Sequence, residues 1–584
     1  MSIVETPDLL EPRQVAGAAG LLGVFNAAGV LDAADVHVAA RLSELAGETD
    51  ETVALALALV VRAVRGGSVC VDLGTVAAEV GVPDLRWPEP SAWLGAVQAS
   101  VLADSPAVLR VYDDRLVYLD RYWREEEQVC ADLLASIGVG EPIDENWLTR
   151  ALDRVFRSAG YDEHRVAARI ALSQWTTVLT GGPGTGKTTT VAALLALLSE
   201  QASLAGRPRP RIALAAPTGK AAARLQEAVQ AEIDKLDAPD RERLAGLHAV
   251  TMHRLLGARP DTSVRFRHNR GNRLPYDVIV VDETSMVSLT MMARLLEAVR
   301  PQTRLILVGD PDQLTSVEAG AVLADLVDGL GARNAGCVAA LRTSHRFGEV
   351  IGHLAEGIRA GDADRVLELL HGGGEHIEWL AEAEVSGLRG VLMPHVLALR
   401  DAAAVGDVEA ALAGLQRHRL LCPHRDGPSG VSYWNRQVEQ WLTEETHEPT
   451  WSAWYPGRPV LVTANDYGLR LFNGDTGVAV VRDGVIRAVI ASPSGPVEFA
   501  TTRLADVQTM HAMTIHKSQG SQAEEVTVLL PPADSRLLTR ELLYTAVTRA
   551  RQKVRVVGSE AEVVAALGRR AVRATGLGMR LSAT

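Results

Sequence analysis

One glycine-rich segment, residues 181–188, constrains the fold of this chain more than any other feature. Its sequence, GGPGTGKT, satisfies the phosphate-binding pattern G-x-x-x-x-G-K-[ST]. The apolar run at 177–180 predicts a strand before the loop, and residues 189–198 predict an apolar helix after it. The loop needs this order because backbone N–H groups and the helix N-terminus must converge on phosphate oxygens. The sequence therefore predicts a nucleotide-hydrolysing α/β domain.

The residues of this loop have separate expected roles. Lys187 is expected to reach the β- and γ-phosphates, and Thr188 to hold Mg²⁺. A chance Gly-rich turn is the alternative, and the complete strand–loop–helix context argues against it. The positions expected to contact the nucleotide are Gly181, Gly182, Pro183, Gly184, Thr185, Gly186, Lys187, Thr188 and Thr189.

Length and composition bound the class of protein. A chain of 584 residues is too long for one core, so we expect three or four domains. A hydrophobic content of 47% and a charged content of 22% are typical of globular proteins. The sequence starts with no signal-peptide pattern and has no apolar stretch long enough to span a bilayer. Four distant cysteines without a Cys-x-x-Cys pair indicate free thiols, a cytoplasmic location and no zinc site.

Negative charge is concentrated at the amino-terminal end. The formal net charge is −13, but residues 1–150 hold 24 acidic side chains, 10 arginines and no lysine. The rest of the chain is therefore close to neutral. A strongly acidic module would repel nucleic-acid phosphates, so we expect it to dock on a protein partner. A solvated surface that only aids solubility is the alternative.

The pattern of apolar residues changes along the chain. Residues 1–150 are expected to form a mainly helical domain closed by a hairpin around Asp113-Asp114. From about residue 160, short apolar runs alternate with helical patterns, which predicts α/β domains with parallel sheets. Strands joined by Asn-Gly, Asp-Gly and Ser-Gly turns predict a small inserted β-barrel. The expected domains are 1–150, 151–335, 336–465 with 507–584, and the insertion 466–506. The tail from residue 569 is expected to be loosely ordered.

Polar residues follow two further strands of the first α/β domain. Asp282 and Glu283 end the apolar run 278–281, where Asp282 could hold Mg²⁺ and Glu283 could polarise the attacking water. Gln313 follows the run 305–308 and could sense the γ-phosphate.

Other strand ends suit a nucleic-acid phosphate. Thr218-Gly219 and the Thr251–His253 junction precede expected helices, and helix N-termini bind phosphates. Both threonines could instead be simple helix caps. Two segments far from Lys187, 513–520 and 543–551, add a domain whose Arg549 could reach the nucleotide when a cleft closes.

Together these segments resemble the superfamily 1 helicases of the 5′→3′ branch. The ordered set is GGPGTGKT, APTGKAA, TMHRLLG, VVDETSMV, GDPDQLTSV, SHRF, TIHKSQGS and YTAVTRAR. More narrowly, the chain is similar to the RecD family, the alpha subunits of RecBCD (exonuclease V) complexes. RLVYLDRYW at 115–123, LCPHRDGPSG at 421–430 and NDYGLRLFNGD at 465–475 favour RecD. The resemblance covers about residues 105–580.

This resemblance implies a fold and a function. The fold would be two RecA-like P-loop domains with parallel sheets, a small β-barrel inserted in the second, and a mainly helical N-terminal domain. The function would be ATP-dependent 5′→3′ translocation on single-stranded DNA and unwinding of double-stranded DNA ends. The partners would be RecB and RecC in a heterotrimer, acting in double-strand break repair and recombination. A nuclease is not expected in this chain.

The resemblance also implies residue roles. Lys187, Thr188, Asp282, Glu283 and Gln313 would bind and hydrolyse MgATP, with Arg346 and Arg549 as cations from the second domain. The residues expected along single-stranded DNA are Thr218, Gly219, Thr251, His253, Thr514, His516 and Lys517. His164 stands where the family often has an adenine-reading Gln, which leaves adenine selectivity open.

Several alternatives stay open. The chain could be a stand-alone helicase of the same branch, or a regulatory subunit with weak motor activity; the complete set of motor residues argues against a decayed ATPase. The motifs alone do not separate DNA from RNA. Aromatic residues make up only 4% of the chain, so backbone contacts should dominate nucleic-acid binding. Tyr467 and Phe472 are expected to pack within the small barrel rather than stack on bases.

Overall fold

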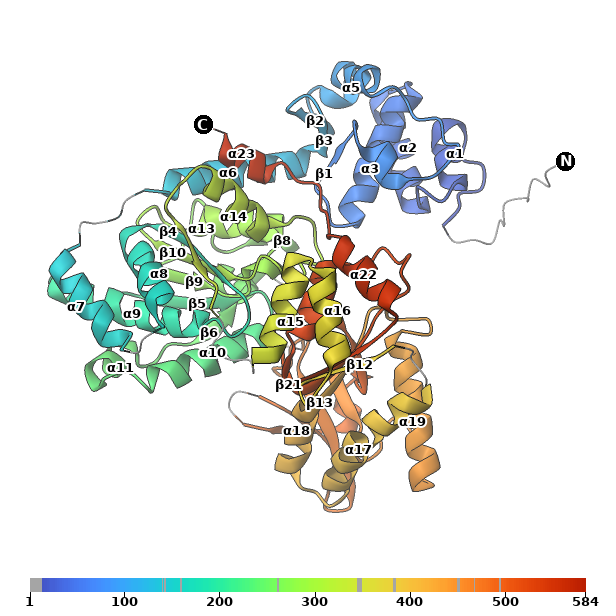
Figure 1. Cartoon of the computed structure of the whole chain (residues 1–584). Helices are drawn as coiled ribbons and strands as arrows, with labels where there is room; N and C mark the ends of the chain where they lie inside the picture. Colours follow the sequence, from blue (N-terminus) through green and yellow to red (C-terminus); the bar gives the residue numbers. More distant parts are fainter. Residues whose placement is uncertain are drawn as a thin grey trace.

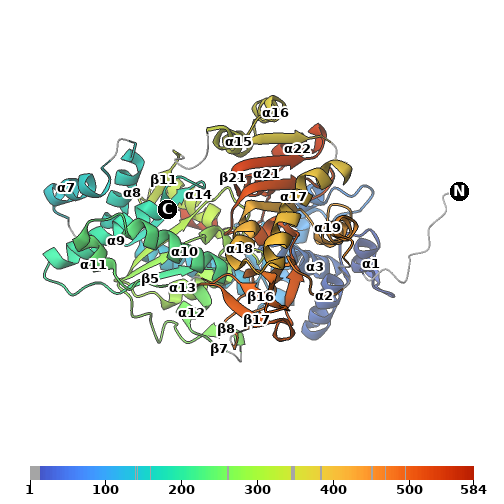
Figure 2. The ribbon, with the colours of Figure 1, turned by 90° about the horizontal axis from the view of Figure 1, so that it is seen from below.

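Two parallel β-sheets in separate α/β domains form the centre of the structure, and a mainly helical domain precedes them (Figure 1). Seen from below, the two α/β domains lie side by side (Figure 2). The computed structural model describes residues 13–138, 140, 143–157, 160–259, 262–343, 349–381, 385–448, 452–466, 468–492 and 495–583. Arg346 and Tyr467 lie outside the described residues.

The first α/β domain is built on a six-stranded parallel sheet. Its order is β11 (Val338–Leu341), β4 (Thr176–Gly181), β10 (Arg304–Gly309), β9 (Val278–Val281), β5 (Ile212–Ala216) and β6 (Ala249–Thr251). Neighbouring side chains of a strand point to opposite faces, so Val278 and Val280 join one core while Ile279 and Val281 join another. Burial on both faces explains why these strands are continuously apolar.

Helices cover both faces of this sheet. One face carries α8 (Asp162–Ser173), α9 (Lys187–Leu204), α10 (Gly219–Ile233) and α11 (Ala238–Leu244). The other carries α12 (Met252–Leu256), α13 (Leu289–Ala298) and α14 (Val322–Ala332). Strand β11 extends the domain to residue 341, beyond the boundary expected at 335. It pairs with β4, about 160 residues earlier, and such a distant pairing leaves no local signal in the sequence.

The second α/β domain has a five-stranded parallel sheet. Its order is β12 (Ile377–Leu380), β21 (Ala550–Val557), β20 (Ala523–Leu529), β13 (His418–Cys422) and β19 (Ala512–Thr514). Its helices are α15 (Glu349–Ala360), α16 (Ala363–Gly372), α17 (Val385–Ala404), α18 (Val408–Arg417), α19 (Val431–Thr446), α20 (Ile515–Ser518), α21 (Arg540–Val547) and α22 (Glu560–Gly568). The two-domain α/β fold expected from the motifs is confirmed.

A five-stranded antiparallel sheet is inserted in this second domain. Its order is β17 (Val497–Ala500), β16 (Val485–Ile490), β15 (Thr476–Arg482), β14 (Pro459–Val462) and β18 (Val507–Thr509). Asp483 and Gly484 take positive φ values of 51° and 75°, the geometry of a tight hairpin turn. The paired strands begin at 459 and end at 509, so the insertion is wider than the expected 466–506. Its first and last strands in sequence, β14 and β18, pair with each other across the rest of the insertion, and such a distant pairing leaves no local signal.

In the described part of the N-terminal domain, the helices pack around α3. They are α1 (Gly20–Ala27), α2 (Ala33–Ala46), α3 (Glu51–Arg65), α4 (Val76–Val80) and α5 (Pro90–Ala99). Residues 53–60 of α3 are all buried, which is typical of a central helix. The expected hairpin forms from β2 (Leu109–Tyr112) and β3 (Leu116–Leu119), with positive φ at Asp113 and Asp114, and β1 (Cys70–Asp72) pairs with β3.

This small sheet joins the N-terminal domain to the first α/β domain. After the helicase resemblance of their motifs, the two α/β domains are named the first and second motor domains. Val71 and Val117 face the N-terminal helices, whereas Cys70 and Tyr118 belong to the core of the first motor domain. Two further helices, α6 (Asp120–Ser136) and α7 (Glu145–Val155), pack on the first motor domain. The boundary expected at residue 150 therefore falls inside a helix, and α6 already belongs to the interface.

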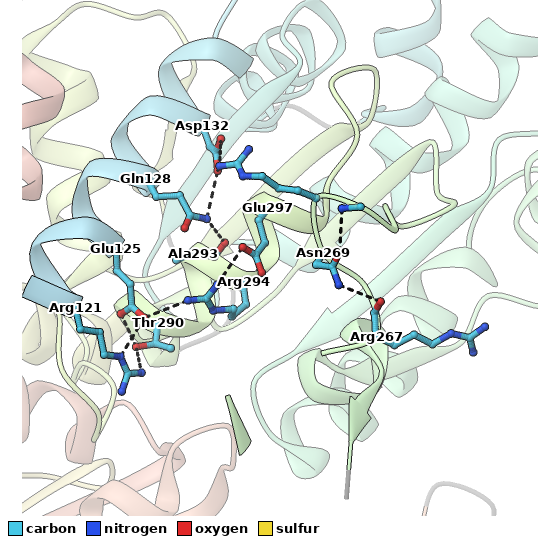
Figure 3. A network of polar contacts seen from close by, with 12 residues as sticks. Arg121, Glu125, Gln128, Asp132, Arg267, Asn269, Thr290, Ala293, Arg294 and Glu297 are labelled. Carbon is cyan, nitrogen blue, oxygen red and sulfur yellow. Dashed lines mark hydrogen bonds and ion pairs between the residues drawn. The ribbon is translucent and has the colours of Figure 1, made fainter. Parts of the chain in front are cut away.

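Polar contacts fix α6 on α13 and on the loop before β9 (Figure 3). Asp132 accepts two hydrogen bonds, of 2.9 and 2.8 Å, from Arg270. Gln128 donates to the carbonyl oxygen of Ala293 at 2.9 Å, and Thr290 donates to Glu125 at 2.7 Å. Glu125 and Asp132 of α6 are thus paired within the chain.

The carboxyl-terminal segment crosses from the second motor domain to the first. Helix α23 (Leu577–Ser582) packs on α14, and Leu577 and Leu581 are fully buried. Before it, Val69 of the N-terminal domain donates to the carbonyl oxygen of Ala574 at 2.9 Å. The expectation of a loosely ordered tail is wrong. Leu577 and Leu581 join the core of the first motor domain, and such a contact between distant segments leaves no local signal in the sequence.

A buried carboxylate, Glu126 of α6, holds this segment. It accepts hydrogen bonds from the Tyr118 hydroxyl at 3.0 Å, Thr575 Oγ1 at 2.8 Å, the Gly576 N–H at 3.0 Å and Arg580 Nε at 3.3 Å. Burial raises the pKa of Glu126, and these donors act in the opposite direction. One carboxylate thus connects the hairpin, α6 and the tail.

Replacing Glu126 by alanine is expected to leave Arg580 as an uncompensated buried charge. The free energy of unfolding should fall by about 3–5 kcal/mol, the usual effect of breaking a buried ion pair. Thermal unfolding together with limited proteolysis of the tail measures this loss. The exposed neighbour Glu127, changed to alanine, is the control. Equal unfolding curves for both variants would contradict the role given to Glu126.

Candidate nucleotide and nucleic-acid site

The loop 181–187 joins β4 to α9 as the sequence predicts. Gly184 and Gly186 take φ values of +83° and +80°, which side chains rarely adopt. A Cβ on Gly186 would lie 2.5 Å from His164 Nε2, and one on Gly181 would lie 2.8 Å from the Leu341 carbonyl oxygen. These glycines are therefore needed both for the turn and for the close approach of its neighbours.

Lys187 lies over this loop at the first turn of α9. Its Nζ donates to the carbonyl oxygens of Gly181 at 2.5 Å and Gly182 at 2.9 Å. The ammonium group is thus held where the loop curves. Gly181 and Gly182 use two of its N–H donors, and the third can bind another acceptor. This placement fits a lysine that meets a phosphate rather than one that packs in a core.

Asp282 and Glu283 follow the buried strand β9, as expected. Burial and the neighbouring Glu283 raise the pKa of Asp282 to about 6, and Lys187 acts in the opposite direction. Glu283 has φ 51°, a strained left-handed conformation for a non-glycine residue, and such strain clusters at functional sites. Two repelling carboxylates with the hydroxyl of Thr188 offer the hard oxygen donors that Mg²⁺ prefers, so this set fits a divalent cation.

Gln313 is held by an acid that the sequence analysis did not select. Its Nε2 donates to Asp310 Oδ2 at 3.0 Å, and the Tyr544 hydroxyl of the second motor domain donates to the same oxygen at 3.1 Å. Burial raises the pKa of Asp310, whereas Lys187 lowers it. Asp310 stands in the GDPDQ motif, so only its proximity to the predicted Gln313 could have drawn attention to it.

Arg549 reaches the site from the second motor domain. Its guanidinium is buried and donates to the carbonyl oxygens of Thr545 at 2.9 Å and Ser521 at 3.3 Å. Burial lowers the pKa of Arg549, and the carboxylates of Glu283 and Asp310 raise it. The guanidinium therefore lies in the electric field of the first domain's carboxylates. Its expected partner Arg346 lies outside the described residues.

His164 lies buried beneath the phosphate loop. Its Nε2 is 3.0 Å from the carbonyl oxygen of Thr185, and its ring meets that of Tyr161 edge-on at 4.7 Å. This position supports the loop backbone through a hydrogen bond. Reading of adenine by His164 stays a prediction.

The three threonines expected along nucleic acid all cap helices. Thr218 Oγ1 accepts from the Ala221 N–H at 3.1 Å, Thr251 Oγ1 from Arg254 at 3.2 Å, and Thr514 Oγ1 from Lys517 at 3.2 Å. Each follows a parallel strand, β5, β6 or β19, so each cap stands at the carboxyl edge of a sheet. Capping is confirmed, and contact with nucleic acid stays a prediction.

The inserted sheet lies against the first of these caps. A Cβ on Gly219 would be 2.8 Å from Phe472 Cβ, so Phe472 packs on the start of α10. Burial, Arg419 and Arg224 lower the pKa of the adjacent Lys220 to about 7, and Asp475 of the insertion raises it. Lys220 belongs to the APTGKAA segment that the sequence singles out, directly after Thr218-Gly219.

The remaining predicted nucleic-acid residues lie near these caps. His253 is exposed on α12 with its ring 5.8 Å from that of Phe266, and Lys517 is exposed on α20. His516 is half-buried, and burial lowers its pKa.

In the part of the chain that the structure describes, no helix is both long and apolar enough to cross a membrane.

Comparison with known families assigns the three parts of the chain. The family described as "RecBCD enzyme subunit RecD, N-terminal domain" matches residues 27–114. An "AAA domain" matches residues 164–319, and a "UvrD-like helicase C-terminal domain" matches residues 509–557. In turn, these matches cover much of the N-terminal domain, the phosphate loop of the first motor domain, and Arg549 of the second.

Curated relatives match nearly the whole chain. The "RecBCD enzyme subunit RecD" of Mycobacterium tuberculosis (strain ATCC 25618 / H37Rv) is 67% identical over 568 residues, 97% of this chain and 98% of the relative. That of Mycolicibacterium smegmatis is 68% identical over 556 residues, 95% of this chain and 98% of the relative. The chain belongs to the RecD family.

A more distant relative is described as a helicase and not as a RecBCD subunit. The "ATP-dependent RecD2 DNA helicase" of Deinococcus radiodurans is 32% identical over 482 residues, 80% of this RecD-family chain and 59% of that protein. The resemblance to the RecD family that the motifs indicated is thus confirmed.

Asp282→Asn is expected to abolish ATP hydrolysis and to stabilise the RecD-family chain in the absence of Mg²⁺. The pKa of Asp282 is raised from 3.8 to about 6, so the folded state binds more protons than the unfolded state in this window. Stability therefore falls as pH rises from about 4 to 6. Near neutral pH the amide should raise the free energy of unfolding by roughly 1–3 kcal/mol.

Denaturant unfolding with and without Mg²⁺ measures this effect. The control is the exposed Asp364 of α16, changed to asparagine. It should change neither ATP hydrolysis nor the free energy of unfolding. A lower free energy of unfolding for Asp282→Asn would contradict the conclusion that burial of this carboxylate is unfavourable.

Proposed function

We propose that this RecD-family chain is an ATP-dependent 5′→3′ single-stranded-DNA translocase and DNA helicase. It acts as the RecD subunit of a RecBCD helicase/nuclease complex, in double-strand break repair and homologous recombination. Its substrates are DNA ends in both single- and double-stranded form. We place the chain in the cytoplasm, the reducing compartment that its free cysteines favour.

The observation that carries this proposal is a nucleotide site made from both motor domains. The main-chain N–H of Leu314, beside Gln313, donates to Thr545 Oγ1 at 2.9 Å, and its carbonyl oxygen accepts from Gln519 Nε2 at 2.7 Å. Arg549 lies in the field of Glu283 and Asp310. Residues of the second domain thus contact the nucleotide site of the first. Nucleotide hydrolysis can therefore be coupled to movement of the domains, as a motor requires.

The chain's own residues would divide the work of hydrolysis. MgATP, when bound, supplies the phosphoanhydride bond and a charge that neutralises Asp282. Lys187 and the loop N–H groups would bind the phosphates, with Thr188 and Asp282 as the Mg²⁺ ligands. Glu283 would take the proton of the attacking water, and Gln313 would orient that water. Arg549, with Arg346, would stabilise negative charge in the transition state.

The helix caps support a path for single-stranded DNA across both domains. Thr218 and Thr251 cap helices on the first sheet, and Thr514 caps one on the second. Backbone phosphates bind readily at helix N-termini, and Gly219 begins the helix that Thr218 caps. His253, His516 and Lys517 would line the same path.

We assign partner binding to the N-terminal domain, with RecC and RecB as the partners. Its excess of carboxylates argues against contact with DNA. Helix α2 also exposes Val38 by 40% and Leu45 by 66%, two positions seven residues apart on one face. A stand-alone helicase is the alternative, and the identity of 67% to a named RecBCD subunit against 32% to RecD2 favours the subunit.

Polarity is the sharpest test of the motor. Duplexes with a 5′ or a 3′ single-stranded tail should be unwound from the 5′ tail, in the presence of MgATP. Lys187→Ala is the matched control, because it removes the phosphate-binding ammonium without changing the DNA-facing caps. Unwinding from 3′ tails, or unwinding by the Lys187→Ala variant, would contradict the proposal.

A charge placed on α2 tests partner docking. The double change Val38→Glu and Leu45→Glu is expected to weaken co-purification with the partner subunits by roughly tenfold or more, since buried apolar contacts dominate interface energy. Val405 of the second motor domain is 81% exposed, so Val405→Glu is the matched control. Single-strand binding and its salt dependence should be unchanged in both. Normal assembly of the α2 variant would place the docking surface elsewhere.

A further inference from the structure

Tyr544 of the second motor domain touches the nucleotide site of the first. It lies on α21 and is only 4% exposed. Its hydroxyl donates to Asp310 Oδ2 at 3.1 Å, across 234 residues of sequence. The same hydroxyl lies against the phosphate loop, because a Cβ on Gly182 would be 3.0 Å away from it. One phenol group therefore meets two separate elements of the nucleotide site.

The acceptor of this hydrogen bond also holds Gln313. Oδ2 of Asp310 accepts from Gln313 Nε2 at 3.0 Å, and Oδ1 accepts from the Asp312 N–H at 3.1 Å. The amide of Gln313 is thereby turned so that its Oε1, which is buried, has no hydrogen-bond partner among the described residues. A buried acceptor left without a partner is costly unless a ligand or water completes it.

Tyr544 cannot move independently of its domain. Next to it, Thr545 accepts from the Leu314 N–H, and five residues later Arg549 donates to the carbonyl oxygen of Thr545. The phenol, the threonine and the arginine are thus placed by one short segment. Any displacement of the second motor domain would withdraw all three from the first together.

We propose that Tyr544 is a positioning residue for hydrolysis, which orients Gln313 through Asp310 only when the two motor domains are closed. The hydroxyl fixes the carboxylate, the carboxylate fixes the amide nitrogen, and the amide oxygen is then aimed at the attacking water. The inference deepens the proposed ATPase function and rests on it. It gives Tyr544 a role in coupling domain closure to turnover, distinct from phosphate binding by Lys187 and Arg549.

The test is Tyr544→Phe in the full chain, which keeps the ring and removes the hydroxyl. DNA-stimulated kcat should fall roughly ten- to a hundredfold, as expected for one hydrogen bond to a charged group, while KM for ATP stays within about twofold. Tyr455→Phe is the matched control. Tyr455 is also buried, and its hydroxyl donates to Glu439 at 3.0 Å in the same domain, away from the nucleotide. It should lose comparable stability and keep its kcat.

The pH profile gives a readout that a purely structural role would not move. The titratable and charged groups facing Asp310 are Lys187 from the loop, Asp312 from its own segment, and the Tyr544 phenol and Arg549 from the second domain. Removing a donor to a carboxylate raises its pKa. The acidic limb of kcat should therefore shift to higher pH in Tyr544→Phe and stay in place in Tyr455→Phe.

A double mutant separates this inference from the function that it rests on. If Tyr544 acts through Gln313, adding Tyr544→Phe to Gln313→Ala should cause almost no further loss of kcat. Additive losses, or wild-type kcat in Tyr544→Phe, would overturn the inference. A wild-type chain without DNA-stimulated hydrolysis would instead overturn the proposed function.

Discussion

The main chain of Leu314 joins two separately folded sheets into one site. Both of its polar groups are satisfied by the second motor domain, at 2.9 and 2.7 Å, although the residue itself lies in the loop after β10 of the first. Parallel sheets bring their functional loops to the carboxyl edges of their strands. Two such edges facing each other form a seam, and a few hydrogen bonds across that seam set the distance between the phosphate loop and Arg549.

The seam is costly to maintain. It contains buried carboxylates whose pKa values are raised, a buried guanidinium whose pKa is lowered, and a strained backbone at Glu283. None of these features stabilises the fold, and each becomes useful only when a polyphosphate and a cation occupy the site. The stability that offsets them comes from the continuously apolar strands of both sheets, which are covered by helices on each face.

The hairpin of the N-terminal domain and the carboxyl-terminal segment meet on the first motor domain and complete its core. The hairpin contributes Tyr118 to that core, and the carboxyl-terminal segment contributes Leu577 and Leu581. Glu126 accepts hydrogen bonds from both segments. The N-terminal domain is therefore not a separate appendage, because its sheet has one face in the motor. A partner that binds it would act on a body fixed to the nucleotide site.

Local sequence patterns determined most of the residues of the nucleotide site and of the helix caps. The phosphate loop, the carboxylates after β9, Gln313 after β10 and the capping threonines follow from apolar runs that end in polar residues, so strand ends and helix starts could be placed without a structure. Tertiary structure decided the rest. The pairing of β11 with β4, the outer strands of the insertion, the docked tail and the contact of Tyr544 with Asp310 join segments that are distant in the chain. Periodicity and turn signals describe neighbours in sequence, whereas these contacts depend on which surfaces the folded domains present to each other.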